Sequence, residues 1–364
     1  MNENKSSLLT VKDLQVHRGG APVLDISSLD IAAGNILSLI GPNGAGKSSL
    51  LLALSFLINK TSGEIFFHGR HVLTKDDIFT YRRRLAMVFQ EPLLLDTTVR
   101  ENIAAGLKMR HKPKDEMENS VARYAEMFGI THLLTRSARA ISGGEAQRTS
   151  LARALATEPE LVFLDEPFAS LDPPTKEALL ADLQRILSIT KTTAVITTHD
   201  RNDALRLSDY IAVMKQGEII QQGRPEDIMN RPADEYVAGF VGVETVVRGE
   251  VIASRDGINV IAVAGNNLEA TGDYAPGSHV LCCIRPEYVT IAAASGAPTS
   301  ARNIFNARIE KISPLGLFYK VELDVGFPLI SYVTSISLDN LALAVGKNIS
   351  ASFKATALHL IPSR

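Results

Sequence analysis

The chain has 364 residues, enough for two domains that each bury a core. It carries 38 Lys and Arg against 40 Asp and Glu, and this balance predicts no nucleic acid partner. No signal peptide pattern opens the chain, and its longest apolar run, residues 50–58, is far shorter than the ~20 residues that cross a bilayer. These features predict a cytoplasmic protein that forms no pore of its own.

Short strand patterns alternate with helical patterns from residue 8 to about 241, which is typical of an α/β domain. Several strand segments show little alternation, which predicts burial on both faces of a sheet. Residues 175–187 predict an amphipathic helix capped by Asp172, with Pro173 in its first turn. The predicted strands of this part are residues 36–40, 85–89, 161–164, 193–197 and 210–214.

Around residues 240–250 the helical periodicity fades and short alternating segments begin, at 280–284, 288–292, 318–323 and 349–353. They predict a small all-β domain, with residues 292–299 as a linker between its halves. We therefore divide the chain into residues 1–242 and 243–364. The adjacent Cys282 and Cys283 suit neither a disulfide nor a metal site and are expected to be buried in a strand.

A phosphate-binding loop follows the predicted strand 36–40. Its sequence fits the pattern G-x-x-x-x-G-K-[ST], in which backbone N–H groups and the start of a helix surround phosphate oxygens. We expect Lys47 to reach the β- and γ-phosphates of ATP and the Ser48 hydroxyl to bind Mg²⁺. The predicted phosphate-binding residues are Gly41, Pro42, Asn43, Gly44, Ala45, Gly46, Lys47, Ser48 and Ser49.

Two acidic residues follow the buried strand 161–164. A carboxylate there is costly unless an ion or hydrogen bonds compensate, so Asp165 is predicted to hold Mg²⁺. Glu166 is predicted to be the general base that activates the attacking water. Taken alone, an Asp-Glu pair after a strand is often only a helix cap, and the phosphate-binding loop upstream favours the catalytic interpretation.

The segment Ile141-Ser142-Gly143-Gly144-Glu145, followed by Ala146-Gln147-Arg148, resembles the signature motif of ABC ATPases. Ile and Glu replace the family's usual Leu and Gln at its first and fifth positions. The resemblance implies an ABC cassette of the P-loop NTPase fold with a helical signature subdomain. It also implies that Ser142, Gly143 and Gly144 contact ATP held by a second copy, in a head-to-tail dimer.

Other positions resemble further motifs of the same family. Gln90 resembles the Q-loop glutamine that touches Mg²⁺. Asp172, in Ser170-Leu171-Asp172, resembles the aspartate of the D-loop. His199 resembles the switch histidine that contacts the γ-phosphate. The family often stacks an aromatic residue on adenine upstream of the P-loop. Here His17 and Arg18 are the candidates, and a solvent-exposed role is an equal alternative.

A β domain after the cassette resembles importer subunits, as does Arg285-Pro286-Glu287. The segments after residue 300 resemble the OB-like TOBE or molbindin-like domain of molybdate and tungstate transporters. The resemblance implies a subunit at the cytoplasmic face of the inner membrane, with permease subunits and, indirectly, an extracytoplasmic solute-binding protein as partners. It favours molybdate or tungstate uptake, with sulfate next, then polyamine, iron or sugar.

Two alternatives remain open at this point. The β domain either binds oxyanion, with Asn303, Thr334, Ser335 and Lys354 as hydrogen-bond donors, or is a purely structural barrel. The second alternative is a different functional class for the whole chain, the ABC ATPases that act on nucleic acid or ribosomes. The short span between Lys47 and Ser142 leaves no room for the long coiled coils of chromosome-type members, and the single cassette is unlike ribosome-acting members.

Overall fold

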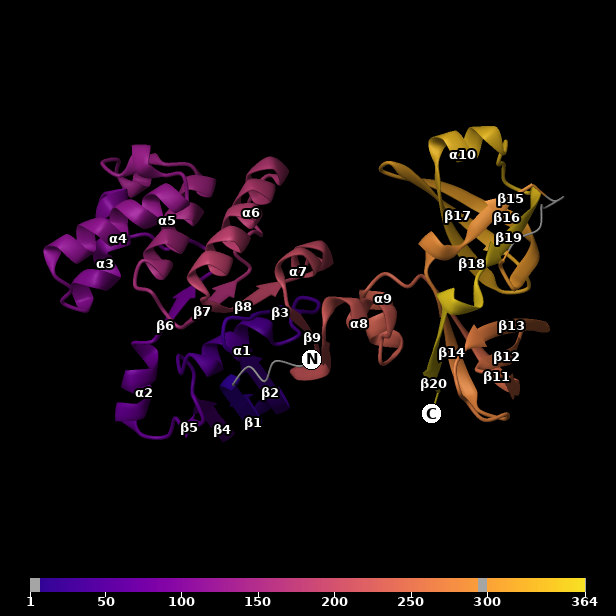
Figure 1. Ribbon diagram of the computed structural model, residues 1–364, viewed down its shortest axis with the longest axis horizontal. Helices are drawn as coiled ribbons and strands as arrows, with labels where there is room; N and C mark the ends of the chain where they lie inside the picture. The colour runs from indigo at the N-terminus through magenta and orange to yellow at the C-terminus, as the bar shows by residue number, and fades with distance from the viewer. Residues whose placement is uncertain (1–6, 294–299, 364) are drawn as a thin grey trace. The chain divides into compact units, whose positions relative to one another are not determined.

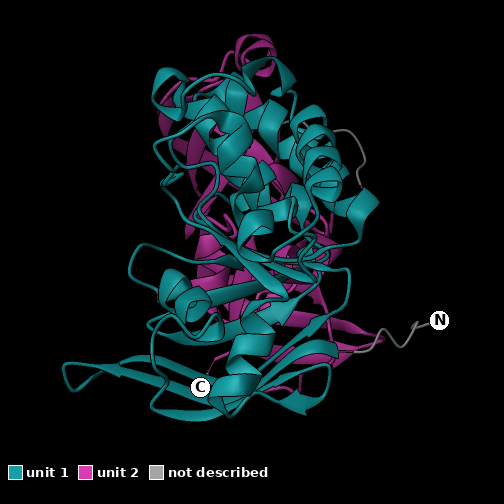
Figure 2. Ribbon diagram, turned by 90° about the vertical axis from the view of Figure 1, so that its left-hand side faces the viewer, with its two compact units in different colours: residues 1–225 teal, residues 226–364 magenta. Residues whose placement is uncertain are grey.

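The computed structural model of the protein describes residues 7–293 and 300–363. The chain forms two compact units, Met1–Pro225 (unit 1) and Glu226–Arg364 (unit 2), which Figure 2 shows in different colours. The sequence placed the division after residue 242. The difference arises because α8 (Pro225–Asn230) and α9 (Glu235–Phe240) group with unit 2. The predicted linker 292–299 lies mostly outside the described residues.

Side chains from the β-strands of unit 2 hold α8 and α9. Arg285 donates to the carbonyl oxygens of Met229 and Val241, one near the end of α8 and the other just after α9. His359 Nε2 lies 3.1 Å from the carbonyl oxygen of Pro232. Burial lowers the pKa of His359, so the ring is neutral near pH 7 and donates this hydrogen bond.

A six-stranded sheet runs through unit 1 in the order β10-β9-β3-β8-β7-β6. All neighbouring pairs from β9 to β6 are parallel, and β10 pairs antiparallel with β9. The five predicted strands are present to within one residue, and β10 adds a sixth strand that pairs with β9. They are β3 (Ile36–Ile40), β6 (Leu85–Val88), β7 (Leu161–Asp165), β8 (Thr193–Thr198), β9 (Tyr210–Lys215) and β10 (Glu218–Gly223).

The central strands are buried on both faces, as their continuous apolar runs predict. In β7, Val162 and Leu164 pack into one core, and Leu161 and Phe163 pack into another. The first core lies against helices α3 to α6, and the second lies against α1 and a separate antiparallel sheet (Figure 1). The sheet is therefore the middle layer of unit 1 and fixes where its strand ends lie.

Helices and antiparallel strands cover the two faces. The antiparallel sheet has the order β2-β1-β4-β5, with β1 (Ser7–Arg18), β2 (Ala21–Ala32), β4 (Ser62–Phe67) and β5 (Arg70–His71). The helices are α1 (Lys47–Leu54), α2 (Lys75–Arg82), α3 (Val99–Met109), α4 (Lys114–Met127), α5 (Gly143–Leu155), α6 (Pro173–Thr190) and α7 (Arg201–Leu207). Asp172 caps α6, as predicted, and accepts from the backbone N–H of Thr175.

Unit 2 contains two five-stranded antiparallel sheets around one core. The first has the order β13-β12-β11-β14-β20, with β11 (Thr245–Arg255), β12 (Ile258–Val263), β13 (Asn266–Thr271), β14 (His279–Ile284) and β20 (Leu358–Pro362). The second has the order β15-β19-β16-β17-β18, with β15 (Thr290–Ala292), β16 (Asn303–Leu315), β17 (Phe318–Asp324), β18 (Pro328–Thr334) and β19 (Asn348–Phe353). Cys282 and Cys283 are free and buried in β14, which confirms their predicted burial.

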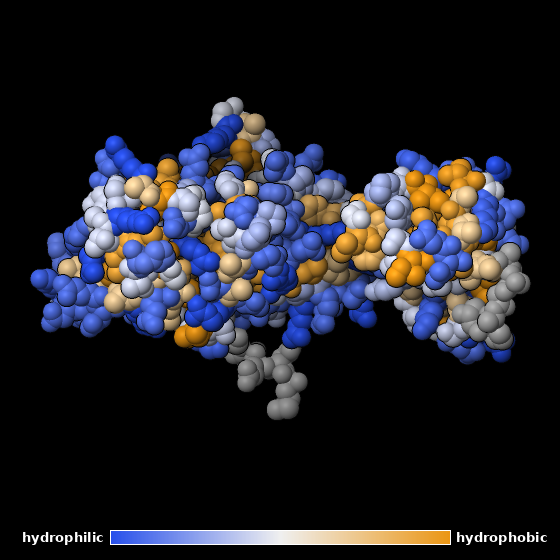
Figure 3. Space-filling view, turned by 90° about the horizontal axis from the view of Figure 1, so that it is seen from above, coloured by the Kyte–Doolittle hydropathy of each residue, from blue (hydrophilic) through white to orange (hydrophobic). Residues whose placement is uncertain are grey.

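Among the described residues, no helix combines the length and apolar character needed to cross a membrane. Exposed apolar side chains occur at the β16–β17 hairpin and on α10 (Ser335–Asn340), where Leu317 and Ile336 are 87% and 70% exposed. Figure 3 shows hydrophobic side chains gathered on the face of unit 2 that carries α10.

The hairpin between β9 and β10 is joined to the phosphate-binding loop through Gly217. Its N–H donates to the carbonyl of Ala45 at 2.9 Å, and its carbonyl accepts from Asp25 N–H at 2.9 Å. Its φ of +88° lies in the left-handed region, and an added Cβ would stand 2.4 Å from the carbonyl oxygen of Val23. The hairpin therefore approaches both β2 and the loop closely only because this residue is glycine.

We expect Gly217→Ala to lower the free energy of unfolding by about 2–3 kcal/mol, because backbone strain and a steric clash add. Urea unfolding measures this change. Gly69→Ala is the matched control: its φ is +72°, but an added Cβ would meet no atom within 4 Å. We expect it to cost only about 1 kcal/mol. Equal losses for both variants would show that the clash at Gly217 is relieved by small movements.

Candidate functional site

The phosphate-binding loop connects β3 to α1 at the carboxyl end of the central sheet. Gly41 opens the loop in a conformation with φ of +155°, and a Cβ there would stand 2.4 Å from the carbonyl oxygen of Met214. Gly46 caps α1, and Lys47 begins the helix. Pro42, Asn43 and Gly44 are exposed at the rim. The loop thus presents backbone N–H groups and the positive end of a helix to solvent, which suits phosphate oxygens.

Lys47 lies under this loop and is only 5% exposed. Its Nζ donates to the carbonyl oxygens of Gly41, at 2.8 Å, and Pro42, at 3.2 Å. Burial lowers the pKa of Lys47, and the nearby carboxylates of Glu166 and Asp165 act in the opposite direction. A lysine held in this way places one positive charge inside the loop, where phosphate oxygens would be bound.

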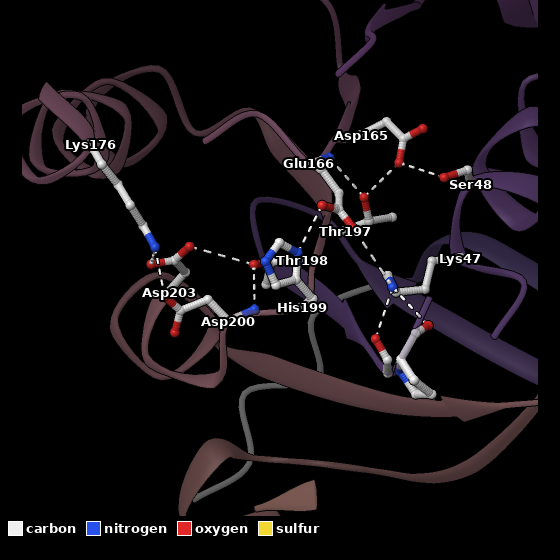
Figure 4. A network of polar contacts seen from close by, with 12 residues as sticks. Lys47, Ser48, Asp165, Glu166, Lys176, Thr197, Thr198, His199, Asp200 and Asp203 are labelled. Carbon is white, nitrogen blue, oxygen red and sulfur yellow. Dashed lines mark hydrogen bonds and ion pairs between the residues drawn. The ribbon is translucent and has the colours of Figure 1, made fainter. Parts of the chain in front are cut away.

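Asp165 ends β7 and is held by hydroxyl groups from two other elements. Its Oδ1 accepts from Ser48 Oγ at 2.9 Å and from Thr197 Oγ1 at 2.7 Å (Figure 4). A serine hydroxyl and a carboxylate on neighbouring elements are oxygen donors that suit Mg²⁺, which keeps several of its waters. The donor set of Ser48 and Asp165 therefore fits Mg²⁺.

Gln90 was predicted to complete the Mg²⁺ ligands with Ser48 and Asp165. It follows β6 and is exposed. Among the described residues, no hydrogen bond joins Gln90 to Ser48 or Asp165, so the structure brings two of the three predicted ligands together. The role of Gln90 stays a prediction.

Glu166 lies between a lysine and a histidine. Its Oε1 is 3.7 Å from Lys47 Nζ, and its Oε2 is 2.8 Å from His199 Nδ1. The residue has a φ of +42°, and its backbone N–H donates to Thr197 Oγ1 at 2.8 Å. This turn directs the carboxylate toward the phosphate-binding loop, and its side chain is 14% exposed. A carboxylate so placed can accept a proton from a water beside bound phosphate.

Thr197 is a site residue that the sequence analysis did not single out. It stands opposite Asp165 in the parallel ladder of β7 and β8, and its hydroxyl contacts both Asp165 and the Glu166 backbone. The sequence places Thr197 at the end of a predicted buried strand, but the pairing of that strand with β7, and its register, are known only from the structure.

A second cluster forms around the signature motif. Ser142 caps α5, and its N–H and Oγ both donate to Glu145 Oε2, at 2.7 and 2.9 Å, while Glu145 N–H donates back to Ser142 Oγ. This is a capping box, and it explains how glutamate fits the fifth position of the motif. The hydrogen bonds from Ser142 hold the pKa of Glu145 below its ordinary value.

The signature motif and the D-loop share one hollow of about 540 Å³, lined by Ser142, Gly143, Gly144, Glu145, Ser170 and Asp172 among others. A Cβ on Gly144 would stand 2.7 Å from Thr175 Cγ2 on α6, so glycine allows this close packing. Within the part of the chain that the structure describes, no hydrogen bond or ion pair joins Ser142 to Lys47, Ser48 or Glu166. One copy therefore carries two separate clusters.

The two candidates for adenine stacking lie at the end of β1. His17 is exposed, with Nδ1 at 3.3 Å from Thr61 Oγ1, and Arg18 is exposed beside it. Neither position decides between stacking on a base and a solvated role.

The four candidate oxyanion ligands in unit 2 are not brought together. Asn303 is 2% exposed, and its amide accepts from the backbone N–H of Glu269 and donates to the Glu269 carbonyl. Lys354 follows Phe353, which pairs with Asn303 at the start of β16. Thr334 caps α10, and Ser335 begins that helix. Both lie near the end of β16 that is opposite to Asn303, about 40 Å away along the strand.

Two family models match this chain. The ABC transporter model matches residues 24–169, which include the phosphate-binding loop, Ser142 and Asp165–Glu166. The TOBE domain model matches residues 299–360, which form most of the second sheet of unit 2 and β20.

Relatives match over nearly the whole chain. The "Molybdate/tungstate import ATP-binding protein WtpC" of Pyrococcus horikoshii is 36% identical, over 92% of this chain and 94% of its own length. The "Sulfate/thiosulfate import ATP-binding protein CysA" of Thermosynechococcus vestitus is 32% identical, over 92% of this chain and 93% of its own length. The "Spermidine/putrescine import ATP-binding protein PotA" of Ruegeria pomeroyi is 36% identical, over 77% of this chain and 76% of its own length.

A solved structure shows the same cassette. The structure of cbiO1 from Clostridium perfringens, described as part of the ABC transporter complex cbiONQ, has a TM-score of 0.58 and 28% sequence identity. It covers 66% of this chain and 96% of its own. The chain therefore belongs to the ATP-binding subunits of ABC transporters, as an importer-type ATPase whose cassette is followed by a TOBE domain.

Proposed function

We propose that this chain hydrolyses ATP at the Lys47–Glu166 site to drive import of molybdate or tungstate. The observation that carries the hydrolytic role is the position of Glu166 between Lys47 and His199, next to the Ser48–Asp165 pair. Ser48 and Asp165 would hold Mg²⁺, which would supply positive charge against the phosphate oxygens. The protein groups then act on the phosphate and on the attacking water.

The phosphate-binding loop, Lys47, Glu166 and His199 act together in the proposed reaction. Backbone N–H groups of the loop and the Lys47 ammonium bind the phosphates and hold the γ-phosphate in place. Glu166 accepts a proton from the water that attacks the γ-phosphorus, while the bond from that phosphorus to the bridging oxygen breaks and ADP leaves. His199, in contact with Glu166, orients this carboxylate and donates toward the γ-phosphate.

We infer that the signature cluster serves ATP bound by a second copy. Within one copy the signature cluster is not joined to the phosphate-binding loop, yet it offers the unpaired N–H groups at the start of α5. Two copies arranged head to tail would close both sites, with Ser142, Gly143, Gly144 and Asp172 across the interface. ATP then holds the copies together, and hydrolysis releases them.

The partner in the membrane is proposed to dock beside β6. A groove of about 450 Å³ there is lined by apolar and basic residues, among them Phe79, Met87, Met109, Arg83, Arg110 and Arg153. Phe79 and Met109 are 62% and 78% exposed and line the same groove, and exposed apolar side chains that gather in one place mark interaction sites. A short permease helix with an apolar face and an acidic residue fits this surface. The subunit would then work at the cytoplasmic face of the membrane.

The choice of molybdate or tungstate rests on the comparisons. The relatives named for these anions match both units of this chain, as does the sulfate/thiosulfate relative, whereas the spermidine/putrescine relatives match 77% and 78% of the chain. Sulfate is therefore the second candidate. An extracytoplasmic binding protein would deliver the anion to the permease.

Glu166→Gln tests the general base. Glutamine keeps the size and can still contact His199 but cannot accept the proton, so we expect turnover to fall by about 10²- to 10⁴-fold with ATP binding retained. Phosphate release and binding of a fluorescent ATP analogue measure the two quantities. Turnover near that of the unchanged chain would remove Glu166 from the role of base.

Glu145→Gln tests the signature cluster. The Glu145 carboxylate stays ionised near neutral pH and occupies the Ser142 donors that the partner's γ-phosphate would need. Removing its charge should lower the KM for ATP by roughly two- to tenfold. Steady-state hydrolysis over a range of ATP concentrations measures this.

The control for Glu145→Gln is Asp77→Asn. Asp77 closes a similar capping box with Thr74 on α2, and neither residue belongs to either cluster. We expect the KM of the Asp77→Asn variant for ATP to be unchanged. A KM shift of the same size in Asp77→Asn, or none in Glu145→Gln, would argue against a γ-phosphate at Ser142.

Uptake in cells tests the substrate and the partner together. A strain lacking this chain should lose uptake of radiolabelled molybdate and tungstate and regain it with the unchanged gene. Uptake that is lost for sulfate alone would favour the second candidate.

The same strain tests the docking groove. Met109→Glu should fail to restore uptake, because it puts an acidic group in the proposed apolar contact, while the purified variant still hydrolyses ATP. Leu73→Glu changes another exposed apolar residue, 65% exposed, outside the groove, and should restore uptake. Restoration by both variants would place the permease elsewhere.

A further inference from the structure

One lysine joins the first turns of two helices that begin beside the site (Figure 4). Lys176, in the first turn of α6, has its Nζ at 2.6 Å from Asp200 Oδ2 and at 2.8 Å from Asp203 Oδ1. Asp200 caps α7, and Asp203 lies in its first turn. The lysine therefore links the start of α6 to the start of α7.

The charges of this group depend on one another. Asp203 is only 6% exposed, and burial raises its pKa, so the carboxylate needs a positive partner to stay ionised. Burial alone would lower the pKa of Lys176, but its hydrogen bonds to the two carboxylates raise it above the ordinary value. Lys176 is thus a firmly held cation, and its loss would leave two carboxylates facing each other.

The same group holds the backbone on both sides of His199. On one side, Thr198 Oγ1 donates to Asp203 Oδ2 at 3.4 Å and accepts from Asp200 N–H at 3.0 Å. On the other side, Asp200 bonds directly to Lys176. The His199 side chain is 57% exposed, so packing does little to fix it. Its orientation toward Glu166 depends on how the backbone of residues 198–200 is held.

We propose that Lys176 positions His199 for ATP hydrolysis by fixing this backbone through Asp200 and Asp203. The inference rests on the role proposed for His199 above. Lys176 also lies one turn after Asp172, the D-loop residue that caps α6. The network therefore runs from the proposed partner-facing cluster to the histidine within one copy, and Lys176 is a positioning residue that acts through the backbone of residues 198–200.

The test is the ATPase activity of the full-length chain carrying Lys176→Met. We expect kcat to fall roughly 10- to 100-fold, because a small displacement of the orienting histidine costs that much, while the KM for ATP stays within twofold. Lys176→Arg keeps the charge and should retain most of the turnover. Circular dichroism and urea unfolding establish that each variant is folded at the assay temperature.

The neighbouring ion pair provides a matched control. Glu177 and Arg206 join the same two helices, but both are exposed, at 59% and 47%, and neither bonds to residues 198–200. Glu177→Gln should therefore leave kcat unchanged. A loss of kcat equal to that of Lys176→Met would mean that any break between α6 and α7 slows hydrolysis, and would overturn the specific role of Lys176.

A double-mutant cycle with His199 decides whether Lys176 acts through it. Single-turnover assays with excess enzyme keep slow rates measurable. In the His199→Ala background, Lys176→Met should add less than a twofold loss. An undiminished further loss, or full activity of Lys176→Met alone, would overturn the inference and leave the proposed function intact. Full turnover by His199→Ala alone would remove the histidine from the proposed reaction and the inference with it.

Discussion

The parallel pairing of β7 with β8 is the interaction on which the site depends. It sets Asp165 opposite Thr197, so that a single hydroxyl bonds to the Asp165 carboxylate and to the Glu166 backbone. The left-handed conformation of Glu166 then directs the second carboxylate toward Lys47. Since β3 pairs with β8 in the same direction, the phosphate-binding loop emerges at the same edge of the sheet. The two buried cores on either side keep these strand ends from shifting.

Each cluster of unit 1 offers the start of a helix and carries a carboxylate close to it. The loop cluster offers a buried ammonium ion and helix N–H groups, which attract phosphate. It also holds acidic residues, which repel phosphate unless a cation or a proton neutralises their charge. The signature cluster offers the start of α5, with a carboxylate already engaged there. Neither cluster alone surrounds a γ-phosphate, and this is why the proposed function requires two copies. The requirement couples the catalytic state to the distance between the copies, which is how an ATPase can do mechanical work.

The sequence predicted well the features that neighbouring residues determine, and poorly those that depend on pairing between segments far apart in the chain. The loop 41–48, the strand ends and the Asp172 cap follow from patterns within a few residues, and the structure contains all three. The antiparallel strands β1 and β2 were not predicted, although Leu9, Val11, Leu14 and Val16 are buried along β1. The spacing of Ser142 and Glu145 fits a capping box, yet the glutamate was read only as a departure from the family motif.

In unit 2, the features that differ from the sequence expectations depend on pairings between distant segments. Asn303 and Thr334 were grouped by residue type, but the ladder β16-β17-β18 sets them near opposite ends of a long strand. The division between the units also differs from the prediction, because Arg285 reaches carbonyl groups far back in the sequence. Composition changes near residue 242 and gives no sign of those bonds.

The anchoring of α8 and α9 bears on how the protein can be dissected. A fragment that starts at residue 243 would lose the carbonyl groups that accept from Arg285 and His359, and so would expose a guanidinium and an imidazole that are now partly buried. A fragment that starts at residue 225 keeps both whole helices with the strands that hold them. For dissection, the polypeptide is therefore best divided before α8 and not after α9.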